Sequence, residues 1–463
     1  MKKILILIIA LFLVSSVNAI DIYDCQDLDI EGETYVLQND VSTDDTCFIV
    51  LADYVTLDAN GSRITGSNNE EGIYLNNYDF FTIRNAKISG FDYGIRIINS
   101  NNNFIEYNQI VDNSGRGMRI SNSDDNIISG NRIENNEDDG IYLQGGGLDN
   151  LIYNNNIKNN GDAGIYFDEI YTSHIYHNYI KNNGFGISFK DEAEGNLIYD
   201  NFIMNNTWWG IYLADEVFDN SFYDNTVESN GVGFYLEYDV VGNSIYNNYI
   251  EHNILFGIYV GEYAEDNLIY NNFFNNNQNI DLDTEEPNFW NIDLTHGRNI
   301  INGPILGGNY WATPSGNGFS QTCEDLNTNG ICDRRYIFDE DNIDFYPLTF
   351  LETVPFMLQI INPLDDSTVN SSSVWLNVVT SENTVCEYIL IHTIQYQWGG
   401  GGGCSMPQNM STTGGTYHSQ LVEGLETTVN NATQRENYGF DVDCVDNSGN
   451  SIEDSVSFFV EII

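Results

Sequence analysis

The stretch NLIYNNNIKNNGDAGIYFDE, Asn150 to Glu169, decides the fold, because altered copies of it recur about every 23 residues. In each copy a glycine precedes an apolar triplet, with gaps of 22 to 24 residues: Gly72, Gly94, Gly117, Gly140, Gly164, Gly186, Gly210, Gly233, Gly257. A column of asparagines keeps gaps of 23 or 24 residues: Asn108, Asn131, Asn155, Asn178, Asn201, Asn225, Asn248, Asn272. Two columns with one period indicate a repeat architecture in which each unit stacks on the next.

Each repeat follows the pattern G-I-Y-L, a variable turn, then N-x-I-x-x-N-x-I. Ile165 and Phe167 alternate with Tyr166, and this period of two predicts short strands with one buried face. No window has sustained helical spacing, so we expect no crossover helices. The sequence therefore predicts an all-β chain with a right-handed parallel β-helix of about 10–11 coils over residues 53–298.

The asparagines have a structural interpretation. Sharp corners between strands need residues that tolerate left-handed backbone angles, and Asn and Gly do so best. Stacked amides can also hydrogen-bond to one another along the coil axis. The alternative, a row of ligand-binding amides, is the weaker reading of a column that repeats in every coil.

The chain begins with Lys2 and Lys3, an apolar run and a small-residue cleavage site, which predict a signal peptide over residues 1–19. No later apolar stretch approaches the ~20 residues of a membrane span, so we expect none after signal removal. Sixteen basic residues stand against 68 acidic ones, a net charge of −52. Such a chain repels nucleic acid and suits cations or cationic partners. We expect a secreted, extracellular or cell-surface protein.

Seven cysteines fit an oxidising compartment. We predict the disulfides Cys25–Cys47, Cys323–Cys332 and Cys386–Cys444, with Cys404 as a competitor for the last. The first disulfide would staple an N-terminal cap over residues 20–52, and the second lies in a C-terminal cap over residues 299–350. Residues 355–463 have short alternating strands with polar turns, which predict an Ig-like β-sandwich.

One acidic column follows the strands of successive coils, spaced 23 or 24 residues apart: Asp168, Asp191, Asp215, Asp239, Glu262, Glu285. Carboxylates stacked one strand apart repel each other unless a cation lies between them. The column is therefore either a solvated acidic face or a line of cation sites, with calcium the cation that carboxylate oxygens favour.

A calcium-type loop lies in the C-terminal cap, in CEDLNTNGICD. Its candidate ligands fall at positions 1, 3, 5, 7 and 9 around Gly330: Asp325, Asn327, Asn329, Ile331 (through its carbonyl), Asp333. Position twelve is Tyr336 rather than Glu, so the loop is a shortened one. We predict a structural Ca²⁺ here, against the alternative of a turn held by the disulfide alone.

Tyrosines form two columns that face outward. One follows the glycines: Tyr142, Tyr166, Tyr212, Tyr235, Tyr259. The other follows a buried apolar residue: Tyr153, Tyr176, Tyr199, Tyr223, Tyr246, Tyr270. Stacked rings stabilise parallel sheets, and exposed rings also bind pyranose faces. Trp208 and Trp209 interrupt the pattern in a turn and are candidates for stacking on a sugar.

The stretches DYVTLDANGSRITG (Asp53 to Gly66) and GGNYW (Gly307 to Trp311), with the repeats between them, resemble NosD-like β-helix proteins. The resemblance covers roughly residues 21–350 and implies the fold. That class includes surface proteins, carbohydrate binders, lyases, hydrolases and epimerases. NosD is associated with copper-site maturation, but the six Met and six His here are scattered, so copper is not expected.

The leading functional hypothesis is a non-catalytic surface protein that binds polysaccharide and is stabilised by calcium. The alternative is a polysaccharide lyase, hydrolase or epimerase that uses Asp191, Asp215 and Asp239 of the acidic column. Motifs of known β-helix enzymes are missing from the sequence, so we lean towards no catalysis.

Overall fold

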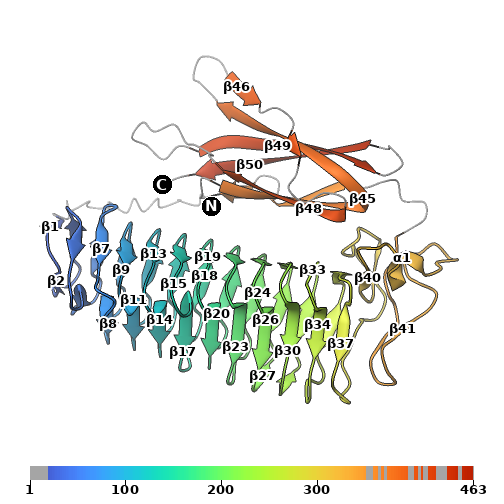
Figure 1. Cartoon of the computed structure of the whole chain (residues 1–463), viewed down its shortest axis with the longest axis horizontal. Coiled ribbons are helices and arrows are strands. Elements are labelled where there is room, and N and C mark those ends of the chain that lie inside the picture. Colours follow the sequence, from blue (N-terminus) through green and yellow to red (C-terminus); the bar gives the residue numbers. More distant parts are fainter. Residues whose placement is uncertain are drawn as a thin grey trace, which may run out of the picture.

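A computed structural model describes residues 19–350 and, beyond them, the strands at 358–362, 367–369, 373–394, 401–404, 408–409, 415–423, 435–446 and 451–461 (Figure 1). In the continuous part, three parallel sheets of twelve strands each wind into one solenoid. From residue 34 to residue 282 each coil contributes one strand to each sheet, in the order sheet 1, sheet 2, sheet 3, while the first coil contributes no strand to sheet 2. The predicted parallel β-helix is confirmed.

Sheet 1 carries the tyrosine column that follows a buried apolar residue. From residue 56 onward each strand buries its central residue and turns its outer residues away from the core, so that Ile152 is buried and Tyr153 faces outward. Its strands are β1 (Ile20–Ile22), β3 (Thr34–Leu37), β6 (Thr56–Asp58), β9 (Thr82–Arg84), β12 (Phe104–Glu106), β15 (Ile127–Ser129), β18 (Leu151–Tyr153), β21 (His174–Tyr176), β24 (Leu197–Tyr199), β28 (Ser221–Tyr223), β32 (Ser244–Tyr246) and β35 (Leu268–Tyr270).

Sheet 2 follows sheet 1 after a corner of two residues. Its inward column is almost entirely isoleucine, including Ile133, Ile157 and Ile180, all fully buried. Its strands are β4 (Val41–Ser42), β7 (Arg63–Thr65), β10 (Lys87–Ser89), β13 (Gln109–Val111), β16 (Arg132–Glu134), β19 (Asn156–Lys158), β22 (Tyr179–Lys181), β25 (Phe202–Met204), β29 (Thr226–Glu228), β33 (Tyr249–Glu251), β36 (Phe273–Asn275) and β40 (Tyr310–Ala312).

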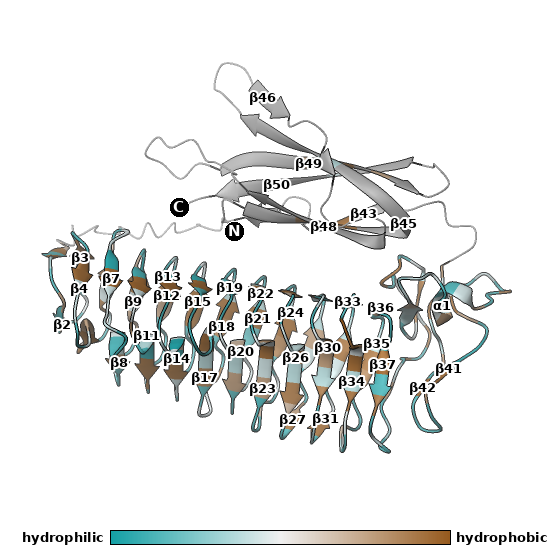
Figure 2. Cartoon of the chain, in the orientation of Figure 1, coloured by the Kyte–Doolittle hydropathy of each residue, from teal (hydrophilic) through white to brown (hydrophobic). Residues whose placement is uncertain are grey.

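Sheet 3 has the longest strands and carries the glycine column. Its strands are β2 (Gln26–Leu28), β5 (Phe48–Val50), β8 (Glu71–Asn76), β11 (Tyr93–Ile98), β14 (Arg116–Ser121), β17 (Ile141–Gln144), β20 (Ala163–Asp168), β23 (Phe185–Lys190), β26 (Trp209–Ala214), β30 (Val232–Leu236), β34 (Phe256–Val260) and β37 (Ile280–Leu282). Figure 2 shows hydrophobic colour along the strands and hydrophilic colour mainly along the turns.

The glycine column is explained by close contact between coils rather than by a left-handed backbone. A Cβ added to Gly186 would lie 2.3 Å from the carbonyl oxygen of Gly210 and 2.4 Å from Ile203. The same contact with the next glycine recurs at Gly72, Gly94 and Gly117. Any side chain at these positions would therefore push two coils apart.

The buried asparagines form ladders along the solenoid axis. Asn155 is representative: its backbone N–H and its Nδ2 both donate to Oδ1 of Asn178 at 3.0 Å, and its Nδ2 also donates to the Ile128 carbonyl at 2.8 Å. Two further ladders run in parallel, one through Asn126 and Asn150 and one beginning at Asn113. The expected axial amide bonds are confirmed.

The residue with left-handed backbone angles at each corner, however, is not the asparagine of the ladder. The positive φ belongs to the residue immediately before it: Tyr107, Gly130, Asn154, His177, Asp200, Asp224, Asn247, Asn271. Each corner therefore separates two roles, because a left-handed residue turns the chain and the following asparagine closes the ladder. This corrects the expectation that one asparagine does both.

The N-terminal segment 20–52, expected as a separate cap, is instead the first part of the solenoid. Strand β1 pairs with β3 and β2 pairs with β5, all in the same parallel register as later coils. The disulfide Cys25–Cys47 joins neighbouring turns of this segment, with a Cα–Cα distance of 4.6 Å. The period is less visible here because the glycine and asparagine columns begin only later.

The C-terminal segment 299–350 terminates the ladders. The backbone N–H of Asn288 donates to Oδ1 of Asn342 at 3.0 Å, and the backbone N–H of Asn309 donates to Oδ2 of Asp344 at 2.8 Å. The segment also contains α1 (Phe319–Thr322) and two short hairpins, β38 (Thr295–His296) with β39 (Ile305–Leu306) and β41 (Tyr336–Ile337) with β42 (Ile343–Asp344). No helix in the described part of the chain is long and apolar enough to cross a membrane.

The C-terminal strands form one eight-stranded sheet around β45 (Ser373–Ile394). Its other members are β43 (Leu358–Asn362), β44 (Ser367–Val369), β46 (Gly401–Cys404), β47 (Gln408–Asn409), β48 (Gly415–Glu423), β49 (Arg435–Asp446) and β50 (Ser451–Glu461). Five strands pair with β45 itself. The Ig-like β-sandwich stays a prediction. The pair Cys386–Cys444 also stays one: the two residues are register partners and Cys444 is disulfide-bonded, but the side chain of Cys386 lies outside the described part.

Candidate functional site

The outer face of sheet 3 changes its chemistry along the rod. Its middle row, read from the strand register, runs Tyr74, Arg96, Arg119, Tyr142, Tyr166, Ser188, Tyr212, Tyr235, Tyr259. The first coils are cationic and the later coils are aromatic. Between them, at Tyr142 and Tyr166, lies a group of carboxylates.

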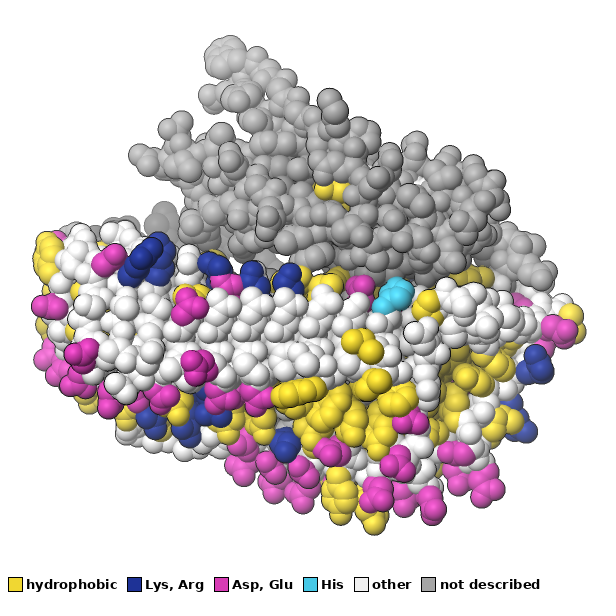
Figure 3. All heavy atoms as spheres, in the orientation of Figure 1, with side chains coloured by type: hydrophobic (Ala, Val, Ile, Leu, Met, Phe, Trp, Pro, Cys, Tyr) yellow, Lys and Arg dark blue, Asp and Glu magenta, His cyan; other side chains and the backbone are white. Residues whose placement is uncertain are grey.

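The aromatic floor consists of Phe185, Trp209, Tyr212, Tyr235 and Tyr259, from strands β23, β26, β30 and β34. Ring centroids of Trp209 and Tyr235 are 4.2 Å apart, those of Tyr235 and Tyr259 are 4.3 Å apart, and Phe185 lies 5.0 Å from Trp209. Figure 3 shows hydrophobic side chains gathered over this lower face, with acidic side chains along its edge. The sheet spacing places successive rings one strand apart, so the floor is continuous.

A ridge borders the floor where the chain turns from sheet 2 into sheet 3. Trp208 lies on this ridge, 49% exposed, and packs 4.9 Å from Phe185. Gly184 lies beneath its ring, since a Cβ there would approach Trp208 to 2.8 Å. Ile254 and Leu255 continue the ridge at 69% and 57% exposure. The predicted tryptophan pair is therefore divided, with Trp209 on the floor and Trp208 on the ridge.

The opposite border is acidic, but its register differs from the predicted column. Asp168 pairs with Lys190, and Lys190 pairs with Ala214, so Asp168 is not stacked on Asp191. Lys190 Nζ lies 3.7 Å from Oδ2 of Asp215, which places a cation of the chain among the carboxylates. The expectation of one unbroken column is wrong, because a spacing of 23 does not fix the register where turn lengths differ.

Turn geometry also limits the acidic border as a binding site. Asp191, Asp215 and Asp239 have left-handed φ values of 50°, 59° and 54°, while Glu262 and Glu285 are exposed. Burial, with Asp168 and Asp215 nearby, raises the pKa of Asp191. Other border carboxylates accept hydrogen bonds from outward tyrosines of sheet 3. Tyr142 donates to Asp168 at 2.6 Å, and two tyrosines of the floor do the same: Tyr212 donates to Glu237 and Tyr259 donates to Asp283 at 3.1 Å.

A cluster of three carboxylates lies at the start of the aromatic floor. Asp138, Asp139 and Asp162 each offer an oxygen within 4.8 Å of the others, and within the continuous part and the described strands this is the one such group. Arg116 donates to Oδ2 of Asp139 at 2.8 Å and lies 3.2 Å from Asp138. Burial raises the pKa of Asp139 to about 6 even though Arg116 opposes the shift.

Sequence analysis missed this cluster, although a signal existed. Asp138 and Asp162 each stand two residues before the repeat glycine and lie 24 residues apart. The arginines also adjoin the carboxylates, because the Arg116 guanidinium lies 4.1 Å over the ring of Tyr142, whose hydroxyl reaches Asp168.

The tyrosine column of sheet 1 is a stack rather than a platform. Adjacent rings from Tyr153 to Tyr270 lie 5.0–5.2 Å apart with interplanar angles of 3° to 15°. Each ring covers the face of the next, so the faces are occupied within the stack. Trp209, Tyr235 and Tyr259 of the floor are stacked as well, so sheet 3 differs from sheet 1 by the exposed Trp208 beside its rings and by the carboxylates along its border.

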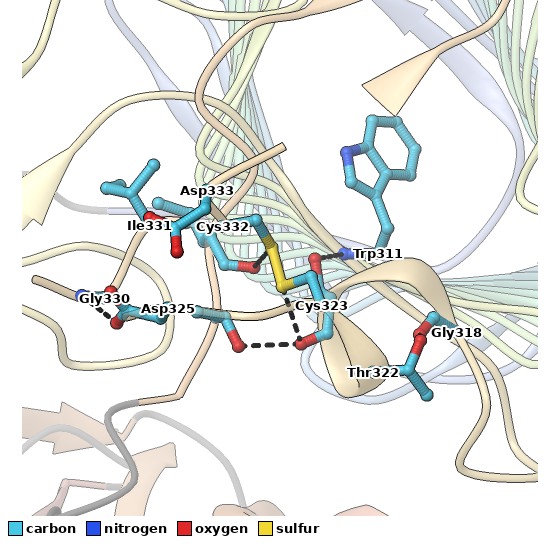
Figure 4. Close-up of a disulfide and its surroundings, with 12 residues drawn as sticks. Trp311, Gly318, Thr322, Cys323, Asp325, Gly330, Ile331, Cys332 and Asp333 are labelled. Carbon is cyan, nitrogen blue, oxygen red and sulfur yellow. Dashed lines mark hydrogen bonds between the residues drawn. A yellow bond between two sulfur atoms is a disulfide. The ribbon is translucent and has the colours of Figure 1, made fainter. Parts of the chain in front are cut away.

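The calcium-type loop is compact and closed by Cys323–Cys332 (Figure 4). The Asp325 carboxylate accepts the backbone N–H of Asn329 at 3.1 Å and of Gly330 at 2.8 Å. Asp333 accepts the N–H of Leu326 at 2.8 Å and the Nδ2 of Asn327 at 3.4 Å. Gly330 has a φ of 83°, which supports the predicted sharp turn at the sixth position.

Comparison with known proteins agrees with this geometry. The family model described as "Right handed beta helix region" matches residues 18–168 and 71–227. This chain is a right-handed parallel β-helix repeat protein. Residues 203–316 of the β-helix protein also match the model described as "Periplasmic copper-binding protein (NosD)". No curated protein matches the chain.

Solved structures share the fold at low identity. The periplasmic alginate epimerase AlgG is 15% identical with a TM-score of 0.37, over 56% of this chain and 77% of that one. The Dettilon tailspike protein is 15% identical with a TM-score of 0.47, over 95% and 86%. The A-module of the mannuronan C-5 epimerase AlgE6 from Azotobacter vinelandii is 13% identical with a TM-score of 0.41, over 56% and 89%. These values support no statement about activity.

Copper does not fit the residues that the structure describes in this β-helix protein. Copper is held by thiolate, thioether and imidazole donors gathered at one point. Met118 is buried in the core, and the sulfur of Met204 accepts from the Tyr179 hydroxyl at 3.4 Å. His177 and His252 instead lie beside the carboxylates of Asp200 and Glu228. We therefore derive no copper chemistry here.

Proposed function

We propose that this β-helix protein is an exported, non-catalytic polysaccharide-binding protein of the cell surface or medium. The observation that carries the proposal is the aromatic floor on sheet 3, bordered by Trp208 on one side and by carboxylates on the other. The half-buried rings of the floor, together with Trp208 at 49% exposure, provide aromatic surface on which the sugar rings of a linear polymer can pack. The disulfides and the predicted signal peptide support export.

The charge on the outer face of sheet 3 indicates which class of polysaccharide this face can bind. Carboxylates border the floor from Asp168 onward, and the whole chain carries a net charge of −52. Such a surface repels a polyanion at long range. A neutral or amino-sugar polymer therefore fits the aromatic part of the floor better than a uronic acid polymer.

Trp209→Ala should weaken binding of a neutral or amino-sugar polysaccharide at least tenfold, about 1.4 kcal/mol, because it removes the ring at the centre of the floor. Glycan-array screening followed by calorimetry on the polymer found would measure it. Tyr199→Ala, in the middle of the sheet 1 stack, is the matched control and should leave affinity unchanged. Equal affinity for wild type and Trp209→Ala would refute the proposed face.

A second candidate function is polysaccharide cleavage or epimerisation. The specific observation is the carboxylate cluster of Asp138, Asp139 and Asp162 at the start of the floor, whose spacing approaches the ~5–5.5 Å of retaining glycosidases. This location fits better than Asp191, Asp215 and Asp239, which stand on left-handed turns. New reducing ends or unsaturated uronates that disappear in Asp162→Asn would favour this candidate, and binding without turnover favours the first.

We also propose that Ca²⁺ binds in the loop from Asp325 to Asp333 and orders the C-terminal end of the rod. Calcium at a concentration of 100 times its Kd would stabilise the folded loop by about 2.7 kcal/mol. The Tm should therefore rise when calcium is added. Asp325→Asn should remove most of that rise, while Glu324→Gln, next to it and exposed, should retain it. Differential scanning fluorimetry after EDTA treatment measures both; the same calcium response in Asp325→Asn would exclude the loop.

A further inference from the structure

Outward positions at the ends of three adjacent strands in sheet 2 carry acidic and amide oxygens that are fully enclosed. Glu228 ends β29, Glu251 ends β33 and Asn275 ends β36, and the register places the three side by side. Their exposed fractions are 4%, 0% and 4%. Outward residues of a solenoid are normally solvated, so enclosed carboxylates here need a physical explanation.

The oxygens of this row are not satisfied by the protein. Glu228 Oε2, Glu251 Oε1 and Asn275 Oδ1 are buried and have no hydrogen-bond partner. Asn275 Nδ2 donates to the other oxygen of Glu251 at 3.0 Å, which fixes the orientation of both groups. A buried carboxylate without a partner costs several kcal/mol, and two side by side also repel each other.

No cation of the described chain neutralises the row. Lys181 is two strands from Glu228, with Met204 between them in the register. His252 Nδ1 lies 4.0 Å from the other oxygen of Glu228, which is beyond hydrogen-bonding distance. Burial raises the pKa of Glu228 to about 7 and that of Glu251 to about 8, so near neutral pH the row is balanced either by protons or by a cation from outside these side chains.

We propose that Glu228, Glu251 and Asn275 hold a hard divalent cation of the Ca²⁺ or Mn²⁺ type. Adjacent strands are ~4.8 Å apart, so the carboxylates of these register partners are close enough to share one cation, and carboxylate oxygens are the ligands that Ca²⁺ prefers. Carboxylate and amide oxygens are hard donors, which bind hard cations in preference to soft metals. The site lies within residues 203–316, so this matched segment would use oxygen ligands rather than copper ligands.

This site is separate from the calcium-type loop and does not depend on the polysaccharide proposal. Calorimetric titration of the full mature chain with Ca²⁺ and with Mn²⁺, after EDTA treatment, tests it. Glu251→Gln and Glu228→Gln should each lose one equivalent, or at least tenfold in affinity, because an amide replaces a charged ligand. Asp325→Asn should retain that equivalent and lose the one from the loop. Glu31→Gln, an exposed carboxylate near the N-terminal end of the rod, is the control and should bind as wild type does.

Equal stoichiometry and equal affinity in wild type, Glu228→Gln and Glu251→Gln would overturn the proposal, as would binding of Cu²⁺ without Ca²⁺ or Mn²⁺. The glutamine variants keep side-chain volume, and their circular dichroism in EDTA should match wild type. If one variant does not fold, anomalous scattering from Mn²⁺ in wild-type crystals decides the question. A peak between residues 228 and 251 supports the site, and Mn²⁺ peaks only elsewhere refute it.

Discussion

Asn155→Ala should lower the free energy of unfolding by about 4 kcal/mol, because each buried polar group left without a partner costs about 1–3 kcal/mol. The substitution removes the acceptor for the backbone N–H of Asn131 at 2.9 Å and for its Nδ2 at 3.1 Å. It also leaves the carbonyl of Ile128 without this donor. Urea unfolding followed by circular dichroism measures the loss as a lower midpoint.

Asn154→Gly is the matched control, one residue away in the same corner. Asn154 is exposed and has a φ of 55°, which glycine adopts without strain. We expect a change within about 1 kcal/mol. If the two substitutions had equal effects, the ladder would not be the source of corner stability, and composition alone would explain the asparagines.

Gly186→Ala should destabilise the rod by about 3 kcal/mol, at the upper end of the range for overpacking. The new Cβ would come within 2.4 Å of Gly210 and Ile203, and the first of these contacts is with backbone that cannot rotate away. A lower Tm and a lower urea midpoint are the expected readouts. The relaxation would have to separate β23 from β26, which also carry Phe185 and Trp209 of the aromatic floor.

The comparison for Gly186 is Gly146→Ala. Gly146 has a φ of 82° but no atom within 4 Å of an added Cβ, so its cost is conformational and about 1 kcal/mol. A Gly186→Ala variant as stable as Gly146→Ala would show that the coils have room for a methyl group, and the explanation of the glycine column would fail.

Much of the fold was predictable because the signal is repeated. The glycine and asparagine columns each recur eight times or more, and that periodicity predicts parallel strands stacked in register. The ladder hydrogen bonds follow from the same column, as Asn155 and Asn178 illustrate. The N-terminal coil was assigned as a cap because residues 20–52 carry neither column, although their backbone pairs in the same way.

The candidate sites were less predictable, since they depend on register rather than on period. Asp168 is the register partner of Lys190, 22 residues later, rather than of Asp191. Trp208 and Trp209 are separated because Trp208 lies in the corner and Trp209 begins β26. Nothing in the spacing separates Glu228 and Glu251, buried at the ends of their strands, from exposed carboxylates elsewhere. Their enclosure depends on what surrounds each position in three dimensions.

The sequence by itself determined that this chain is a β-solenoid, because each coil repeats the same local requirements: a glycine without room for a Cβ, a buried apolar residue and an asparagine amide. Only the tertiary structure decided which side chains meet. Neighbours across coils are about 23 residues apart in sequence, and a shift of one residue turns a side chain to the opposite face of its strand. Hence the carboxylate cluster at Asp138 and the enclosed oxygens at Glu251 became visible only in the folded chain.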